Sequence, residues 1–327
     1  MHFRLATEAD LPDCLALLRS AGLTRLSPRV WAGLPELLRR HLRADRQRPK
    51  SVMLWEQLQP DGTAILQAFG VSLFVDDATY DALRDGDAPY FAEALCTAWL
   101  DDRAGVLSAD AIARDNAGGG LNVVAPFYVQ RHHDLNHPVS RRLMPLGAAA
   151  WFFCHGGYNV RRILWEAYGQ PSLEYLLAGG FRHLRSFPAP ADGPRDCQPH
   201  WCEVTREDHA RPAAFNAMAM WAMVPPPPRM HLPLSQQSVV ILALQGDTDQ
   251  RVAARLQISL DAVKQAWRAI SAAAAPFVPE LHDPPGDGSG LGVRGAERRR
   301  VVVEYLRQHM EELRPWPRRA RARSATR

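Results

Sequence analysis

Four consecutive prolines at 225–228 constrain the fold of this chain more than any other feature of its sequence. Proline has no backbone N–H group and a fixed φ angle, so a run of four ends any helix and favours a stiff polyproline II segment. The segment 224–229 (VPPPPR) therefore predicts a boundary between two folded parts, and a second proline-rich stretch, 187–196 (FPAPADGPRD), precedes it. We expect an α/β domain over residues 1–187, a connecting segment over 188–230, a helical domain over 231–275, and a flexible loop, basic helix and tail over 276–327.

Length and composition narrow the class of protein. The 327 residues, 46% of them hydrophobic, suffice for two domains and a sizeable core, which excludes a fibrous or disordered protein. No stretch approaches the roughly 18 apolar residues of a membrane span, and the opening MHFRLATEAD lacks the apolar segment of a secretory signal. The five cysteines are scattered and odd in number, so we expect reduced thiols. We therefore expect a cytoplasmic protein with no membrane partner.

The positive charge is concentrated near the end of the sequence. Residues 294–327 hold eleven arginines against four acidic residues, although the whole chain carries only +4. A basic segment on a slightly acidic body suits a polyanion such as nucleic acid, because each neutralised phosphate releases counterions. The alternative for the last ten residues is a solvated arginine-rich tail.

Residues 1–187 alternate between strand and helix patterns. The hairpin turn Pro60-Asp61-Gly62 joins two of the strands, Thr7 is a candidate helix cap, and a helix opens at Ser27 with Pro28 in its first position. Strands are predicted at 2–6, 52–58, 64–75, 121–130, 160–168 and 181–187, and helices at 7–21, 28–43, 89–100, 139–154 and 171–177. This order predicts an α/β fold with a mixed sheet flanked by helices.

Two segments of this region resemble the GNAT acyltransferase family. They are the opening FRLATEADLPDCLALL at 3–18 and YGQPSLEYLLAGGF at 168–181, which ends in the Gly180-Phe181 pair. The resemblance covers most of residues 1–187. It implies the GNAT-like mixed sheet and, in an active member, an acetyl-CoA site.

The residues that GNAT chemistry requires are incomplete. The family binds the acetyl-CoA pyrophosphate with a glycine-rich turn after the fourth strand, and the matching segment 130–144 (QRHHDLNHPVSRRLM) has no glycine. The family's general-acid tyrosine falls at Leu176, with Tyr175 one position away. Side chains of Arg131, Arg141 and Arg142 could neutralise phosphates instead. Two alternatives stay open: an acyltransferase that uses acetyl-CoA or another acyl-CoA, or a sensing or dimerising module with no catalytic residues.

Other candidate sites have simpler interpretations. Residues 118–120 are a glycine turn before a strand, which is no dinucleotide site. Two clusters contain metal-ligand residue types at unsuitable spacings, and we expect no metal site there: His132, His133, Asp134 and His137, and Cys197, His200 and Cys202. Five aromatic residues are expected in the core or, if the domain binds a small apolar or acyl ligand, in the wall of its pocket: Trp151, Phe152, Phe153, Tyr158 and Trp165.

After the proline run the sequence predicts three short helices. The first, within 234–244, ends at Gly246, and Thr248 and Ser259 are candidate caps of the second and third. The second helix, 249–256, buries small Ala253, and the third carries the apolar stripe Val263, Trp267 and Ile270. Three such helices, with a short turn between the last two, are typical of a helix-turn-helix unit.

Residues 232–275 resemble the LuxR-type helix-turn-helix family. The step 246–248 (GDT), the Val252-Ala253 pair, the turn 256–259 (LQIS) and Val263-Lys264 carry the resemblance. The chain departs from the family where 283–295 (DPPGDGSGLGVRG) separates the third helix from the next, predicted at 296–313. The family's fourth helix usually makes its dimer contacts, so the resemblance does not extend to these dimer contacts in this chain.

The resemblance and the helix pattern together predict binding to double-stranded DNA. On the third helix, Lys264, Gln265 and Arg268 lie opposite the apolar stripe, where they would reach base edges in the major groove. The full set of predicted DNA-binding residues is Thr248, Gln250, Arg251, Ser259, Asp261, Lys264, Gln265 and Arg268. We expect a homodimeric transcriptional regulator with a sensing or dimerising GNAT-like domain. The alternatives are an N-acyltransferase with an accessory helix-turn-helix domain and, for the helices, a protein-interaction module.

Overall fold

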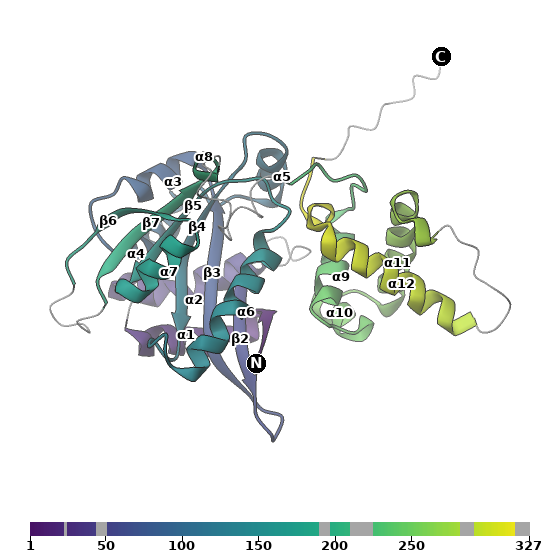
Figure 1. The fold of residues 1–327 in the computed structure, drawn as a ribbon, viewed down its shortest axis with the longest axis horizontal. Helices are drawn as coiled ribbons and strands as arrows, with labels where there is room; N and C mark the ends of the chain where they lie inside the picture. The colour runs from purple at the N-terminus through teal and green to yellow at the C-terminus, as the bar shows by residue number, and fades with distance from the viewer. Residues whose placement is uncertain (23–24, 44–50, 190–196, 210–224, 282–290, 318–327) are drawn as a thin grey trace, which may run out of the picture.

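The computed structural model describes residues 1–22, 25–43, 51–189, 197–209, 225–281 and 291–317. An α/β part precedes the proline run and a helical part follows it (Figure 1). The α/β part contains β1 (His2–Leu5), α1 (Leu11–Ala21), α2 (Pro28–Arg43), β2 (Val52–Leu58), β3 (Ala64–Val75), α3 (Asp77–Arg84), α4 (Phe91–Leu100), α5 (Ala109–Ala117), β4 (Leu121–Gln130), α6 (Pro138–His155), β5 (Val160–Tyr168), α7 (Gln170–Ala178), β6 (Arg182–Ser186), β7 (Pro199–Thr205) and α8 (Arg206–His209). The helical part contains α9 (Leu234–Leu244), α10 (Asp249–Leu256), α11 (Leu260–Ala274), α12 (Leu291–Gln308) and the 3-10 turn η6 (Met310–Leu313). None of the described helices is long and apolar enough to cross a membrane.

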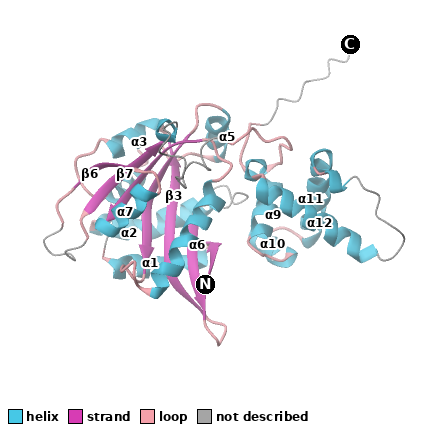
Figure 2. Ribbon diagram, viewed as in Figure 1, coloured by secondary structure: helices cyan, strands magenta, loops and turns pink. Residues whose placement is uncertain are grey.

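The α/β part is built on a mixed seven-stranded sheet in the order β1-β2-β3-β4-β5-β7-β6. Among the described strands, only the β4–β5 pair is parallel, and α6 forms the connection that a parallel pair requires (Figure 2). The mixed sheet flanked by helices confirms the predicted architecture of this part.

Alternation along the strands gives the sheet two buried faces. On β2, Val52 and Leu54 belong to the core beneath α1, α2 and α4, whereas Met53 and Trp55 belong to the core beneath α6. Strand β3 alternates in the same way, with large residues such as Phe69 toward the first core and small ones toward the second. The face beneath α6 therefore has space that the opposite face lacks.

The helical part has well-capped helices, and its buried residues continue the core beneath α6. The Thr248 hydroxyl accepts a hydrogen bond from the Arg251 amide at the start of α10, and the Ser259 hydroxyl accepts one from the Ala262 amide at the start of α11. These are the two predicted caps. The helical part contributes Val240, Val252, Val263, Trp267, Ile270 and Leu306 to the cluster that also contains Met53 and Trp55. Helix α12 packs on α9 and α11, where the Arg299 guanidinium lies 4.2 Å above the Trp267 ring.

A buried arginine joins the two parts. Arg314, 4% exposed, donates from Nε to the carbonyl of Gly156 at 2.7 Å and from Nη2 to the carbonyl of Phe153 at 2.6 Å. Its guanidinium also lies 4.7 Å from the centre of the Tyr158 ring. These carbonyls lie at the C-terminal end of α6, where a positive charge is favoured by the helix dipole. The segment after α12 is thereby fixed to the end of α6.

The structure differs from the predictions in four places. Residues 199–205, predicted to lie in the connecting segment, form β7 between β5 and β6, because they pair with both strands. The short helix α8, in the same predicted segment, follows directly. Helices α3 and α5 were not predicted; both are short, and the side chains of Asp76 and Ser108 cap them. Helix α12 begins at Leu291, within the predicted loop, while 282–290 and 318–327 lie outside the described residues.

Candidate functional site

A cleft of about 510 Å³ opens where β4 and β5 separate. Their parallel pairing ends at Ala125 and Trp165, and Pro126 follows. Proline cannot donate a ladder hydrogen bond, and at this point β4 also contains one residue more than β3, opposite Ser72. The proline and the bulge together account for the divergence of the two parallel strands.

Small residues on two elements give the cleft its depth. Gly70 and Ser72 of β3 line it from the sheet, and Gly147 and Ala148 of α6 line it from the opposite side. A Cβ atom added at Gly70 would lie 3.5 Å from the ring of Tyr128, which is an ordinary contact, so a larger side chain there would occupy space beside that ring. These residues were not predicted to line a site, although the alternating small residues Ala68, Gly70 and Ser72 are visible in the sequence.

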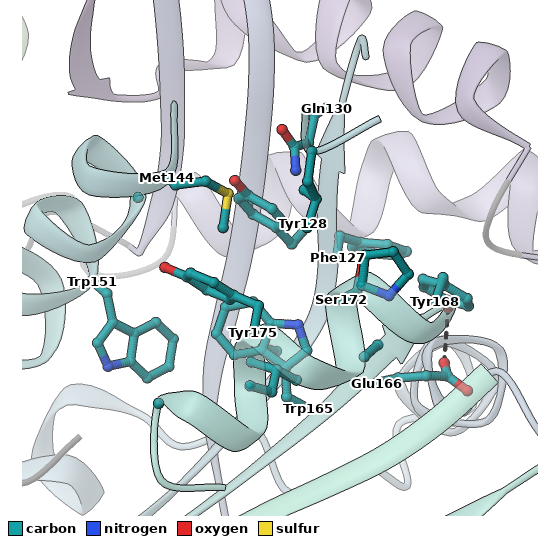
Figure 3. A pocket seen from close by; sticks show the side chains of 18 of the residues that line it. Phe127, Tyr128, Gln130, Met144, Trp151, Trp165, Glu166, Tyr168, Ser172 and Tyr175 are labelled. Carbon is teal, nitrogen blue, oxygen red and sulfur yellow. Dashed lines mark hydrogen bonds between the residues drawn. The ribbon is translucent and has the colours of Figure 1, made fainter. Parts of the chain in front are cut away.

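Aromatic rings form the walls of the cleft. Trp151 and Trp165 have ring centres 5.3 Å apart, and those of Tyr128 and Trp165 are 6.0 Å apart. In Figure 3 the hydroxyl ends of Tyr128 and Tyr175 point toward the side where Met144 and Trp151 of α6 lie. Such a lining favours a ligand with an apolar body.

Two of the five aromatic residues considered as a pocket wall line the cleft, namely Trp151 and Trp165. Phe153 packs instead on Phe3 of β1, with ring centres 5.4 Å apart, and Tyr158 belongs to a separate core cluster. Tyr175 lines the cleft together with its neighbour Leu176. Burial raises the pKa of the Tyr175 hydroxyl, so it is protonated at neutral pH.

Glu166 is a buried carboxylic acid beside the cleft. Its Oε1 accepts hydrogen bonds from the backbone N–H of Tyr90 at 2.7 Å and from the Trp201 indole at 2.9 Å, and its Oε2 accepts one from the Tyr168 hydroxyl at 2.9 Å. Burial raises its pKa, and the hydrogen bonds oppose that shift. Both oxygens are engaged, so Glu166 fixes the surrounding segments.

Ser72 and His155 tie β3 to α6. The Ser72 Oγ and His155 Nε2 atoms lie 2.8 Å apart, and His155 Nδ1 lies 3.0 Å from the Trp151 carbonyl. Because a carbonyl only accepts, Nδ1 carries the proton and Nε2 accepts from the Ser72 hydroxyl. Burial lowers the pKa of His155 to about 3, so the ring is neutral.

The start of α6 lies in segment 130–144, which the sequence resemblance matches to a phosphate-binding turn. Pro138 has no N–H group, and the His137 side chain accepts from the next amide, that of Val139, at 3.2 Å. These two backbone positions therefore cannot act as free donors to an anion. The predicted phosphate ligands Arg131, Arg141 and Arg142 are exposed and lie outside the cleft lining.

The metal-ligand clusters have other contacts. The His132 and His137 rings stack with centres 3.8 Å apart, and His200 Nδ1 lies 2.8 Å from the Ser186 hydroxyl. Among the described residues, no group of three histidine, cysteine or acidic side chains is placed to hold a metal ion.

A second candidate surface lies on α10 and α11. All eight predicted DNA-binding residues are exposed there: Thr248, Gln250, Arg251, Ser259, Asp261, Lys264, Gln265 and Arg268. Lys264 Nζ lies 3.7 Å from the Asp261 carboxylate, a loose surface pair. Val263, Trp267 and Ile270 are buried on the opposite side of α11. The structure thus brings the eight residues onto two consecutive helices.

Comparison with known proteins gives matches only among solved structures, since no family model and no curated protein matches the chain. One is a histone acetyltransferase HPA2 and related acetyltransferase from Corynebacterium glutamicum (13% identity, 62% of this chain and 94% of that chain, TM-score 0.32). Another is spermidine N-acetyltransferase SpeG from Vibrio cholerae (10%, 65% and 99%, TM-score 0.34). A third is the GNAT-like decarboxylase GphF in complex with isobutyryl-CoA (12%, 63% and 98%, TM-score 0.36).

Proposed function

We propose that the protein is a DNA-binding transcriptional regulator that reads double-stranded DNA with α11 and holds a small ligand in the β4–β5 cleft. The observation that carries the proposal is the α10–α11 pair. Three residues connect the helices, with Gln257 in the left-handed conformation and Ser259 as the cap of α11. A connection of this length is typical of a helix-turn-helix unit of the LuxR type.

The side chains on this surface are suited to two kinds of contact, one with base edges and one with phosphates. Lys264, Gln265 and Arg268 are exposed donors on the first turns of α11, the part of a recognition helix that enters the major groove. Thr248 and Ser259 accept from helix amides through their oxygens, which leaves their hydroxyl protons for phosphates. The protein-interaction alternative requires none of these donors.

Binding and selectivity can be separated by experiment. After selection of bound genomic fragments, fluorescence anisotropy compares the selected duplex with a random one. We expect Lys264→Ala and Arg268→Ala each to reduce discrimination by about 1–3 kcal/mol. The control Arg103→Ala removes an exposed arginine of the α/β part and should change neither affinity. Uniform weakening on both duplexes, with unchanged discrimination, would refute base reading by α11.

We further propose that the protein binds DNA as a homodimer. One short recognition helix reads few base pairs, and paired half-sites about one helical turn apart compensate for this. Sedimentation with and without duplex measures the ratio. A complex of one protein per duplex at saturation would contradict the proposal.

An N-acyltransferase is the second candidate, because the cleft lies between the diverging parallel strands and includes the Tyr175 hydroxyl. The capped start of α6 argues against it, since the pyrophosphate would find neither glycines nor free amides at Pro138 and Val139. Release of free CoA from acetyl-CoA in the presence of an amine would establish this activity.

A further inference from the structure

We propose that the β4–β5 cleft binds a small uncharged molecule with an apolar body and an amide-like head group that both donates and accepts a hydrogen bond. The inference rests on the proposed function, which makes the cleft a ligand site, and it specifies the ligand's chemistry. It is carried by two buried, unpartnered polar atoms of residues that line the cleft and by the charges of that lining.

The two polar atoms belong to Trp55 and Gln130. Trp55 is 2% exposed and Gln130 is 8% exposed, and both line the cleft. Among the described residues, neither the indole Nε1–H of Trp55 nor the Oε1 of Gln130 has a hydrogen-bond partner. A buried polar group without a partner costs about 1–3 kcal/mol, and a ligand that supplies the partner recovers this.

The sheet register places these two side chains in one row. Trp55 of β2 pairs with Ala68 of β3, and Ala68 pairs with Gln130 of β4. Directly paired residues share a face, so the indole and the amide flank the small side chain of Ala68. One is a donor and the other an acceptor. A ligand amide is complementary, because its carbonyl accepts and its N–H donates.

The charges of the lining exclude an anionic head group. The described residues around the cleft include no lysine or arginine, so a carboxylate or phosphate would lose its hydration without a cationic partner. Of the two carboxyl groups, Glu166 already accepts three hydrogen bonds, and Asp134 is exposed. Partial desolvation and the neighbouring His132 lower the pKa of His133, which favours its neutral form. The lining therefore favours an uncharged head group, because its described residues offer hydrogen-bond partners but no charged partner for an anion.

The aromatic rings define the body of the ligand. Trp151, Trp165 and Tyr128 present ring faces and edges around a space of about 510 Å³, which lies within the range of drug-sized ligand sites. Figure 3 shows Gln130 projecting beside Tyr128, so the polar position is continuous with the aromatic wall.

Four probes with one carbon skeleton test the assignment: 4-phenylbutanamide, 4-phenylbutanoate, 4-phenylbutylamine and butylbenzene. Calorimetry with the full chain at neutral pH measures each affinity. We expect the amide to bind at least tenfold tighter than the carboxylate and the amine, which corresponds to about 1.4 kcal/mol. Equal or tighter binding of either charged probe, or no binding of any of the four compounds, would overturn the proposal.

Two variants locate the head group. Trp55→Phe keeps a ring and removes the N–H, and Gln130→Leu keeps a side chain of similar size and removes the amide. Each should weaken amide binding about tenfold and leave butylbenzene binding unchanged. Trp31→Phe, on α2 at the opposite face of the sheet, is the matched control and should change neither. If one variant fails to fold, the other decides; unchanged amide affinity in a folded variant refutes the assignment.

DNA binding by the same proteins separates this inference from the proposed function. Anisotropy without any probe measures DNA affinity independently of the cleft. If the protein prefers the amide probe but does not bind DNA, the proposed regulatory function is refuted and the proposed class of ligand stands. If the protein binds DNA but does not prefer the amide probe, only the proposed class of ligand is refuted.

Discussion

Gly157→Ala tests how the C-terminal segment is attached to the end of α6. Gly157 has φ +82°, and a Cβ atom there would lie 2.4 Å from the Glu311 amide nitrogen and 2.4 Å from the Met310 carbonyl carbon. The left-handed backbone alone costs an alanine about 1–2 kcal/mol. The steric clash lowers the free energy of unfolding further, because the backbone of η6 must move away from residue 157. Arg314 follows Glu311 by three residues, so this movement also disturbs its hydrogen bonds to the end of α6. Since hydrogen bonds to a charged group contribute about 1.5–3 kcal/mol each, we expect Gly157→Ala to lower the free energy of unfolding by about 3–5 kcal/mol in total.

Gly62→Ala supplies a matched control for that substitution. Gly62 has φ +83°, and a Cβ atom there would meet nothing within 4 Å, so only the backbone cost applies. Urea unfolding followed by tryptophan fluorescence and circular dichroism measures both free energies of unfolding. Equal losses in the two variants would refute the tight contact between Gly157 and η6.

Three further predictions concern Arg314, His155 and the acyl-CoA alternative. Arg314→Ala should lower the free energy of unfolding in urea by about 3–5 kcal/mol, because buried carbonyls lose a charged donor, whereas exposed Arg307→Ala should cost under about 0.5 kcal/mol. Near-equal losses would contradict the role of Arg314. The folded pKa of His155, about 3, lies below its ordinary value of 6.5, so its contribution to stability is complete above pH 6.5 and is lost as the pH falls toward 3. Between pH 6.5 and 5 the wild type should lose about 2 kcal/mol more than His155→Gln, and parallel pH profiles would exclude this role. Acetyl-CoA should bind weakly or not at all in calorimetry, and submicromolar affinity with CoA release on an amine would favour the transferase.

The sequence predicted the elements whose signals are local. The hydroxyl caps Thr248 and Ser259 and the apolar stripe of α11 placed the helices of the helical part close to where they lie. The β2–β3 hairpin was placed equally well, because a short turn fixes its partner strand. These features depend on residues only a few positions apart.

Features that depend on distant partners escaped sequence analysis. Strand β7 follows a proline-rich stretch, and only its pairing with β5 and β6 makes it a strand. The cleft depends on Pro126 within β4 and on the small residues Gly70 and Gly147, which meet across the sheet–helix space. Pro126 in a central strand was a signal of disruption, but the sequence alone did not indicate which neighbour would separate.

The contact between Arg314 and α6 has a consequence for folding during synthesis. The carbonyls of Gly156 and Phe153 precede their donor by 158 and 161 positions, and the Asn116 side chain donates to the carbonyl of Pro315, 199 positions away. While a ribosome makes the intervening residues, the end of α6 has water as its partner and the apolar face beneath α6 stays partly uncovered. The nascent α/β part therefore folds before these contacts can form, and part of its apolar surface is exposed until then. A chain that stops before Arg314 keeps that surface exposed.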